Sequence, residues 1–152
     1  VGRILQILAI QPMDTILEVG TGSGYLTACL AHLGYMVTSI EIDESLSQSA
    51  AERLQKNNQL NVNLINGDAL QVVDKSKQYD VIVITASVKD VPQVFKQALA
   101  IDGRMFVVTG EEPVMTARLI TRIAADQWSD RVLFETSIKP LVNAEPEKSF
   151  VF

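Results

Sequence analysis

The sequence has very few residues that could form a disulfide or bind zinc. Its 152 residues include one cysteine, Cys29, and one histidine, His32. One cysteine cannot build an internal disulfide framework, and one residue of each kind cannot complete a Cys/His zinc site. We therefore expect no metal site, and a reducing compartment such as the cytoplasm. Cys29 lies among apolar residues of an expected helix and should be inert core, and His32 should be solvated or half-buried rather than catalytic.

Basic charge and long apolar runs are also scarce. The 13 lysines and arginines are outnumbered by 18 acidic residues, which gives a net charge of −5. This balance shows no electrostatic footprint for nucleic acid or for an anionic membrane. The longest apolar stretches, such as residues 81–84 and 105–108, are far shorter than the roughly 18 residues of a membrane-spanning helix. The sequence thus predicts a soluble protein with neither nucleic acid nor a membrane as partner.

The apolar residues that are present suffice for one core. They make up 47% of the chain, and no repeat, low-complexity tract or linker divides it, so residues 1–152 are expected to form a single domain. The first residue is Val1, and residues 1–10 carry apolar side chains at helical spacing rather than as a signal-peptide core. We interpret this start as the edge of a longer chain. The oligomeric state stays open, with a monomer favoured.

Short apolar runs alternate with helical patterns along most of the chain. Five runs have the length of strands, are rich in Val and Ile and are nearly continuous, as in strands buried on both faces: residues 15–19, 36–40, 62–65, 79–84 and 104–108. Three helical patterns lie between them, at residues 23–33, 43–57 and 91–99. This rhythm predicts an α/β fold, a doubly wound and mostly parallel Rossmann-like sheet whose ligands bind beyond the carboxyl ends of the strands.

The rhythm changes after Gly110. Residues 117–123 and 131–141 are rich in β-forming residues and flank a polar segment, residues 125–130. We expect a C-terminal antiparallel hairpin on one edge of the sheet. The order of the strands at that edge is left open.

Glycines gather directly after the first expected strand, in the Gly-Thr-Gly-Ser-Gly-Tyr segment at 20–25. Gly20 allows a tight turn out of the strand, Gly22 lets a ligand approach the backbone, and N–H groups of the following helix point at that ligand. The spacing is G-x-G-x-G, with Tyr25 where the dinucleotide fingerprint has its last glycine. This version suits S-adenosylmethionine, which has no pyrophosphate to seat on the helix.

Two further strand ends carry polar groups in chain order with this loop. Glu41 follows Gly20 by 21 positions and can accept hydrogen bonds from both hydroxyls of a ribose. After the third expected strand, Gly67 lets the chain turn, the Asp68 carboxylate can accept from an adenine amine, and the Ala69 N–H can donate to a ring nitrogen. Three strand ends thus offer groups for methionine, ribose and adenine. They predict S-adenosylmethionine as the cofactor and S-adenosylhomocysteine as its product.

Together these motifs resemble the protein-L-isoaspartate O-methyltransferases, within the class I S-adenosylmethionine-dependent methyltransferases. The residues that carry the resemblance are the 20–25 loop with the following Leu-Thr-Ala, Ser-Ile-Glu at 39–41, Asn-Gly-Asp at 66–68, Val-Ile-Thr-Ala at 83–86, and Pro-Leu at 140–141. The resemblance covers roughly residues 1–141. It implies a transferase that methylates the free carboxylate of L-isoaspartyl residues in damaged proteins, a protein-repair reaction on protein or peptide substrates.

The resemblance also implies which residues hold the cofactor. The first strand end and its loop would line the methionine, the second strand end would hold the ribose and flank the adenine, and the third would bind the adenine edge. The implied set is Glu18, Gly20, Thr21, Gly22, Ser23, Gly24, Tyr25, Glu41, Ile42, Gly67, Asp68, Ala69 and Thr85. No catalytic side chain is assigned, because a carboxylate acceptor is already ionised near neutrality and needs no general base.

The sequence departs from the family pattern at both ends. Family members carry a region ahead of the segment that matches Val1, with a Thr/Ile/Ser loop at the substrate carboxylate, and the tail at 142–150 reads differently. Three readings therefore stay open: a fragment of such an enzyme, a relative that methylates another small acceptor, and a cofactor-binding domain without turnover. An NAD-dependent oxidoreductase is the alternative outside the class, although Tyr25 and the lack of a Tyr-x-x-x-Lys pair weigh against it.

Overall fold

The computed structural model describes residues 2–111, 114–136 and 141. The described helices are α1 (Gly2–Leu8), α2 (Tyr25–Leu33), α3 (Glu44–Lys56), α4 (Ala69–Val72) and α5 (Gln93–Gln97). The described strands are β1 (Thr15–Val19), β2 (Met36–Glu41), β3 (Val62–Asn66), β4 (Tyr79–Val88), β5 (Leu99–Glu111), β6 (Val114–Ala124) and β7 (Gln127–Thr136).

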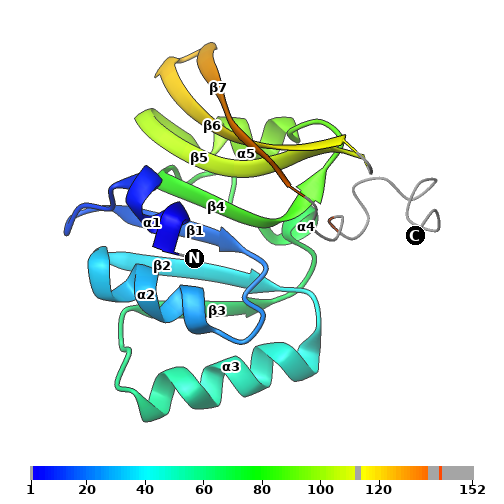
Figure 1. Cartoon of the computed structure of the whole chain (residues 1–152). Coiled ribbons are helices and arrows are strands. Elements are labelled where there is room, and N and C mark those ends of the chain that lie inside the picture. The colour runs from blue at the N-terminus through cyan, green and yellow to red at the C-terminus, as the bar shows by residue number, and fades with distance from the viewer. Residues whose placement is uncertain (1, 112–113, 137–140, 142–152) are drawn as a thin grey trace.

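In the described part of the chain these strands form one mixed sheet in the order β3-β2-β1-β4-β5-β6-β7 (Figure 1). The strands from β1 to β5 pair in parallel, and β6 and β7 add to the β5 edge as an antiparallel pair. The chain reverses its direction of travel across the sheet between β1 and β4, and this switch point is where open α/β sheets bind ligands. The predicted fold class is confirmed, and the hairpin order is now given, with β7 outermost.

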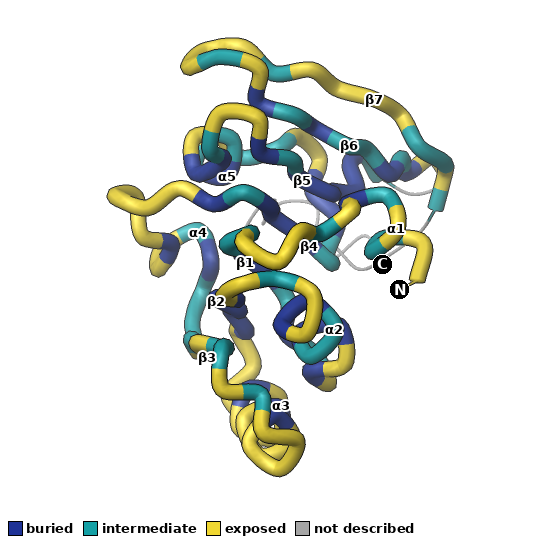
Figure 2. The backbone as a smooth tube through the Cα atoms, turned by 90° about the vertical axis from the view of Figure 1, so that its left-hand side faces the viewer, coloured by how far each residue is buried: buried dark blue, intermediate teal, exposed yellow. Residues whose placement is uncertain are grey.

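Helices cover both faces of the central strands. Leu8 of α1 and Leu30 of α2 pack with Ile16 on one face, and Phe95 of α5 packs with Ile82 on the other. The helix α3 lies against β2 and β3. Figure 2 shows the result: the middle of the sheet is buried, while β7 is exposed along most of its length. Burial on both faces explains why the central strands read as continuous apolar runs.

Helix boundaries differ from the prediction where turn residues intervene. The helix α2 begins at Tyr25 rather than residue 23, because its N-cap Gly24 takes a left-handed conformation. The helix α5 is shorter than predicted because Pro92 precedes it and Leu99 already pairs with β4. The helix α4 was not predicted. Its four residues after the N-cap Asp68 are too few to show a helical period.

The C-terminal strands are longer than predicted. Strand β4 continues to Val88 and β5 begins at Leu99, and the hairpin turn takes only residues 125–126 because residues 127–130 belong to β7. Residues 137–140 of the predicted strand 131–141 lie outside the described residues. No helix in the described ranges is both long enough and apolar enough to cross a membrane.

Candidate functional site

The loop after β1 contains three glycines with positive φ: Gly20, Gly22 and the N-cap Gly24. Gly20 has a φ of +100°, and a Cβ at this position would collide with the Thr85 hydroxyl. That hydroxyl lies 3.1 and 3.0 Å from the carbonyl oxygens of Val19 and Gly20 and can donate to either. Gly22 has a φ of +54°, and nothing lies within 4 Å of the place its Cβ would take. Gly20 thus allows the loop to pack on β4, whereas Gly22 leaves space open above the loop.

Glu41, the last residue of β2, fixes this loop from the neighbouring strand. Its side chain is 7% exposed. Its Oε1 accepts the Gly22 N–H at 2.8 Å, and its Oε2 accepts the Asp43 N–H at 3.0 Å. A carboxylate has about four lone-pair positions, so each oxygen keeps one acceptor position after these two bonds. The remaining pair suits two adjacent hydroxyl donors.

Glu18, on β1, lies beneath the loop and is fully buried. Its Oε1 accepts hydrogen bonds from the Thr27 hydroxyl and, at 2.7 Å, from the Ser39 hydroxyl. The Ser39 oxygen is in turn 2.6 Å from the Thr21 hydroxyl oxygen, so the network reaches the loop. Oε2 of Glu18 has no hydrogen-bond partner among the described residues. Burial raises the pKa of the Glu18 carboxyl to about 7, against the two hydroxyl donors, which lower it.

The end of β3 is tied to the end of β2. The Asn66 side-chain amide donates to the carbonyl oxygens of Glu41 and Ile42 at 2.8 and 3.3 Å, and the Gly67 N–H donates to the Glu41 carbonyl at 2.9 Å. Asp68 then caps α4 by accepting the Leu70 N–H at 3.0 Å. These hydrogen bonds hold the end of β3 beside Glu41.

A pocket of about 160 Å³ lies between these strand ends. Six of the predicted cofactor residues line it: Gly20, Glu41, Ile42, Gly67, Asp68 and Ala69. The rest of its lining is apolar: Val19, Ile40, Ala86 and Leu141. Pockets for whole small molecules usually measure roughly 300–1,000 Å³. The enclosed part therefore fits one ring system, and a longer ligand would extend from it along the open loop at Gly22.

The other predicted residues lie outside this pocket lining. Ser23 is exposed, and its carbonyl accepts from Arg53 of α3 at 2.8 Å. Gly24 caps α2, and Thr85 lies under the loop as described above. The Tyr25 side chain is 66% exposed and lines a separate groove with Cys29 and His32.

Cys29 and His32, for which the sequence predicts no metal-binding or catalytic role, are both on α2. His32 is exposed, as predicted. The prediction that Cys29 is a core residue was wrong, because its side chain is only half-buried. The buried stripe of α2 runs through Leu26, Leu30 and Ala31, and Cys29 lies on its flank.

Sequence reasoning missed the side chains that support the site. Ser39 and Thr27 hold Glu18, and Asn66 braces the pocket wall. A signal existed for Ser39, since it is two residues before Glu41 and alternate residues of a strand share a face. Thr27 and Asn66 carry no such signal, because their partners are set by how α2 and β3 pack.

The fold and the arrangement of strand ends define the class. A Rossmann-like sheet with a G-x-G-x-G loop after β1 and a buried acid ending β2 is the α/β domain of the methyltransferase type. The chain belongs to the Protein-L-isoaspartate(D-aspartate) O-methyltransferase (PCMT) family, whose sequence profile matches residues 1–146. The family resemblance read from the sequence is confirmed.

Individual relatives show how much of the family's length this chain spans. It is 38% identical over 137 residues to a protein-L-isoaspartate O-methyltransferase of Pseudomonas paraeruginosa, covering 90% of this chain and 64% of that protein. It is 31% identical over 145 residues to one of Vibrio atlanticus, covering 95% and 69%. The chain thus spans a little under two thirds of the Pseudomonas relative.

Solved structures share the fold. A Plasmodium falciparum structure, named for a protein-L-isoaspartate O-methyltransferase in complex with S-adenosyl-L-homocysteine, superposes with a TM-score of 0.78 at 23% identity, covering 92% of this chain and 70% of that one. Another chain named protein-L-isoaspartate O-methyltransferase superposes at 0.83 and 23% identity, covering 91% and 45%. At 23% identity, these superpositions show a shared fold.

Proposed function

We propose that this protein binds S-adenosylmethionine across the ends of β1, β2 and β3 and transfers its methyl group to the free carboxylate of L-isoaspartyl residues in proteins. The observation that carries the proposal is Glu41: a buried carboxylate that holds the glycine loop and keeps two acceptor positions. Membership of the PCMT family supplies the acceptor. In this proposal the described residues act as one cofactor-binding domain.

The residues present fit the cofactor. Glu41 would accept both ribose hydroxyls while keeping its backbone bonds. The pocket beside Ile42, Gly67, Asp68 and Ala69 has the size of one ring system and would hold the adenine. The open space at Gly22 would admit the methionine part, which is positively charged at its sulfur and its amine. Oε2 of Glu18 is buried and has no hydrogen-bond partner among the described residues, so it lies below that space as a further polar atom.

Glu18, Thr21 and Thr85 act in this proposal mainly by positioning. The Glu18–Ser39–Thr21 network and the Thr85 hydroxyl hold the loop in its left-handed turns. Ser23 and the N-cap Gly24 precede α2, whose first N–H groups would face the methionine carboxylate. In this proposal Tyr25 contributes only its backbone to the cofactor site, because its side chain lies in the separate groove with Cys29 and His32.

The chemistry needs little from the protein besides orientation. When bound, the sulfonium supplies a methyl group that a carboxylate oxygen attacks in line, and a neutral thioether leaves with the bonding electron pair. No proton moves, because the acceptor is ionised near neutrality. The protein's contribution is then to align the two partners and to exclude water, which can be worth about 7 to 11 kcal/mol in such reactions. The one histidine of the chain, His32, is exposed on α2, which agrees with a reaction that needs no general base.

We further infer that the partners are protein or peptide substrates, with neither nucleic acid nor a membrane among them, and that the protein works as a monomer in the cytoplasm. The net charge of −5 supports the first point, because a phosphate backbone would be repelled. The single thiol at Cys29 is compatible with a reducing compartment.

The test uses two measurements on the same preparation. Calorimetric titration with S-adenosylhomocysteine should show one binding site. Incubation with methyl-labelled S-adenosylmethionine should label an isoaspartyl peptide, and the same peptide with ordinary aspartate should stay unlabelled. Cofactor binding without any label on the isoaspartyl peptide would refute the acceptor, and no binding at all would refute the cofactor.

A further inference from the structure

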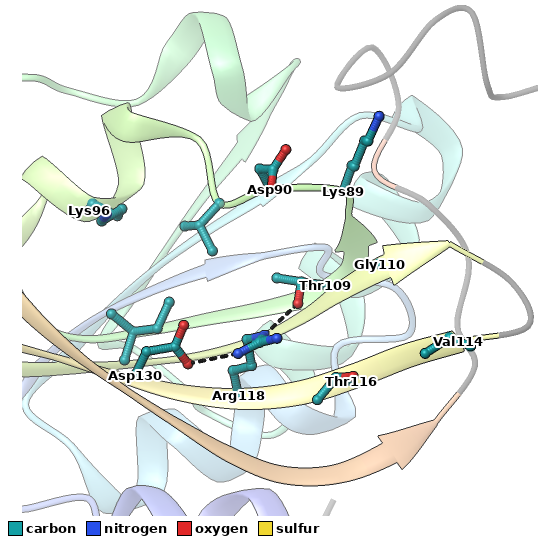
Figure 3. Close-up of a pocket in the computed structure, with 11 residues that line it drawn as sticks. Lys89, Asp90, Lys96, Thr109, Gly110, Val114, Thr116, Arg118 and Asp130 are labelled. Carbon is teal, nitrogen blue, oxygen red and sulfur yellow. Dashed lines mark hydrogen bonds and ion pairs between the residues drawn. The ribbon is translucent and has the colours of Figure 1, made fainter.

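A second pocket lies on the α5 face of the sheet, over the C-terminal part of β5 and the facing part of β6. It measures about 540 Å³, and we call it the Arg118 trough. Figure 3 shows its parts: Lys89 and Asp90 come from the segment after β4, Thr109 from β5, Arg118 from β6 and Asp130 from β7. Unlike the pocket at Glu41, it has a volume within the range of ligand-binding clefts.

The trough is open because α5 covers only one end of this face. At the covered end, the Trp128 ring nitrogen donates to the Lys96 carbonyl of α5 at 3.2 Å, and Arg122 donates to the Leu99 carbonyl at 2.6 Å. Along β6, the alternate residues Thr116, Arg118 and Ile120 face the trough. Thr116 and Arg118 thus bring polar side chains to the trough, as in ligand-binding clefts.

Arg118 is held in place yet keeps donors to spare. Its Nε donates to the Thr109 hydroxyl at 2.7 Å, and its Nη1 lies 3.2 Å from Asp130 Oδ1. The side chain is 30% exposed. A guanidinium has five N–H donors, and the described structure shows these two hydrogen bonds. The remaining donors include both on Nη2, which can donate to a carboxylate.

The charge of the trough is opposite in sign to that of the chain. Lys89, Lys96 and Arg118 line it against Asp90 and Asp130, whereas the chain as a whole carries −5. Lys96 lies over the Trp128 ring, 4.6 Å from its centroid, and Lys89 lies 3.9 Å from Glu111. Arg118 is the cation of the trough that two hydrogen bonds to other lining residues hold in place.

The trough adjoins the pocket proposed for the cofactor. Ala86 lines the pocket at Glu41, and Lys89, three positions further along the same segment, lines the trough. Three residues of extended chain span about 10 Å. A peptide that runs across the ends of β4 and β5, with its acceptor residue at the cofactor, would thus place the side chain of a nearby residue in the trough.

We propose that the Arg118 trough binds the peptide that flanks the acceptor residue, and that Arg118 selects a carboxylate side chain about three positions from it. The proposal rests on the proposed function for the position of the acceptor. It makes Arg118 a specificity-determining residue for acidic substrate segments, separate from the residues that hold the cofactor.

The test compares binding of isoaspartyl peptides that differ at one position. Peptides carry Glu or Gln two, three or four residues before or after the isoaspartate, and their affinity for the protein saturated with S-adenosylhomocysteine is measured by fluorescence anisotropy. At one of these positions the Glu peptide should bind about 5- to 30-fold tighter than its Gln partner. Arg118→Gln should abolish that preference, because it weakens binding of the Glu peptide far more than binding of the Gln peptide. Arg118→Lys should keep part of it, since the charge remains without the planar edge.

Two further variants make the result specific. Arg131→Gln removes an exposed arginine from the next position of β7 after Asp130 and should keep the preference. Asp130→Asn removes the carboxylate that competes for Arg118 and should strengthen binding of the Glu peptide about 2- to 5-fold. Thermal melts of each variant identify any loss of folding, and Asp130→Asn still tests the trough if Arg118→Gln does not fold.

The outcomes separate this proposal from the proposed function. Equal binding of Glu and Gln peptides at every position, or a preference that survives Arg118→Gln, would overturn the role of Arg118. If isoaspartyl peptides are methylated without such a preference, the function stands and the trough proposal fails. If the preference depends on Arg118 but no peptide is methylated, the trough proposal stands and the function fails.

Discussion

Glu41 and Gly22 are joined across the ends of the first two strands, since the Gly22 N–H donates to Glu41 Oε1 at 2.8 Å. The same carboxylate accepts the Asp43 N–H through its other oxygen, at the start of α3. The Glu41 side chain thus holds both the glycine loop and the N-cap residue of α3 in position. The proposed ribose site and the shape of the loop therefore depend on the same residue.

Replacing Glu41 should weaken cofactor binding in two stages. Glu41→Ala loses both proposed ribose bonds as well as the support of the loop, and we expect S-adenosylhomocysteine to bind about 30- to 150-fold more weakly. Glu41→Gln keeps one acceptor oxygen and should cost about 5- to 10-fold. Calorimetry measures both, with Glu44→Ala, an exposed residue in the first turn of α3, as the control. An unchanged affinity for Glu41→Ala would remove this residue from the site.

Gly22 should tolerate no side chain when the cofactor binds. We expect Gly22→Val to lose binding beyond detection while the protein stays folded, because the open space at this position lies outside the core. Valine is also strained at a φ of +54°. Gly22→Asn separates the two causes, since asparagine adopts left-handed backbone far more readily. Loss of binding in both variants indicates that the side chain blocks the ligand, whereas normal binding by Gly22→Asn would show that the glycine serves only the turn.

The elements of the fold that could be predicted are those with a local sequence pattern. The parallel strands could be read from nearly continuous Val/Ile runs, because burial on both faces leaves no polar alternation. The start of α2 could not be placed to the residue, since Gly24 acts as an N-cap without a side-chain bond. The ends of β4 and β5 were also missed, because their pairing continues past the apolar runs through Val88 and Glu111.

The candidate site likewise contains residues whose location could be predicted from the sequence and residues whose location could not. The glycine loop, Glu41 and the Gly67–Ala69 turn follow strands directly, so their common location at one sheet edge was predictable. The buried state of Glu18 was not, because its donors Thr27 and Ser39 are 9 and 21 positions away. The Arg118 trough was missed entirely, since its walls come from four segments that only the hairpin packing brings together.

Arg122 should be the main attachment of the hairpin to α5. It is 5% exposed, and its guanidinium donates to the carbonyls of Leu99 and Gln97 at 2.6 and 3.1 Å. Arg122→Lys keeps the charge but loses the planar guanidinium, whose Nη1 donates to both of these carbonyls and whose Nη2 donates to the Ala125 carbonyl and to Gln97 Oε1. We expect a loss of unfolding free energy of about 2 to 4 kcal/mol in urea denaturation. Arg131→Lys on exposed β7 should change it by less than about 0.5 kcal/mol, and equal effects of the two changes would contradict this assignment.

Glu18 should make the stability of the protein depend on pH in an unusual direction. Its pKa is raised from 4.5 to about 7 in the folded protein, so between these values the folded state keeps a proton that the unfolded state has released. Stability contributed by this proton is complete below pH 4.5 and is lost as the pH rises toward 7. The expected loss is on the order of 3 kcal/mol, from about 1.4 kcal/mol per pKa unit.

Glu18→Gln removes this titration and should flatten the fall in unfolding free energy between pH 5 and 7, measured by urea denaturation at several pH values. The slope is the diagnostic quantity, because the new side-chain NH₂ takes the buried position of Oε2 and can lower the stability at every pH. Ser39→Ala provides the opposite change: it removes a donor that lowers the pKa of Glu18, so the loss of stability should extend to higher pH. A wild-type slope retained by Glu18→Gln would mean that another group titrates in this range, and the buried carboxyl would then be ionised in the folded protein.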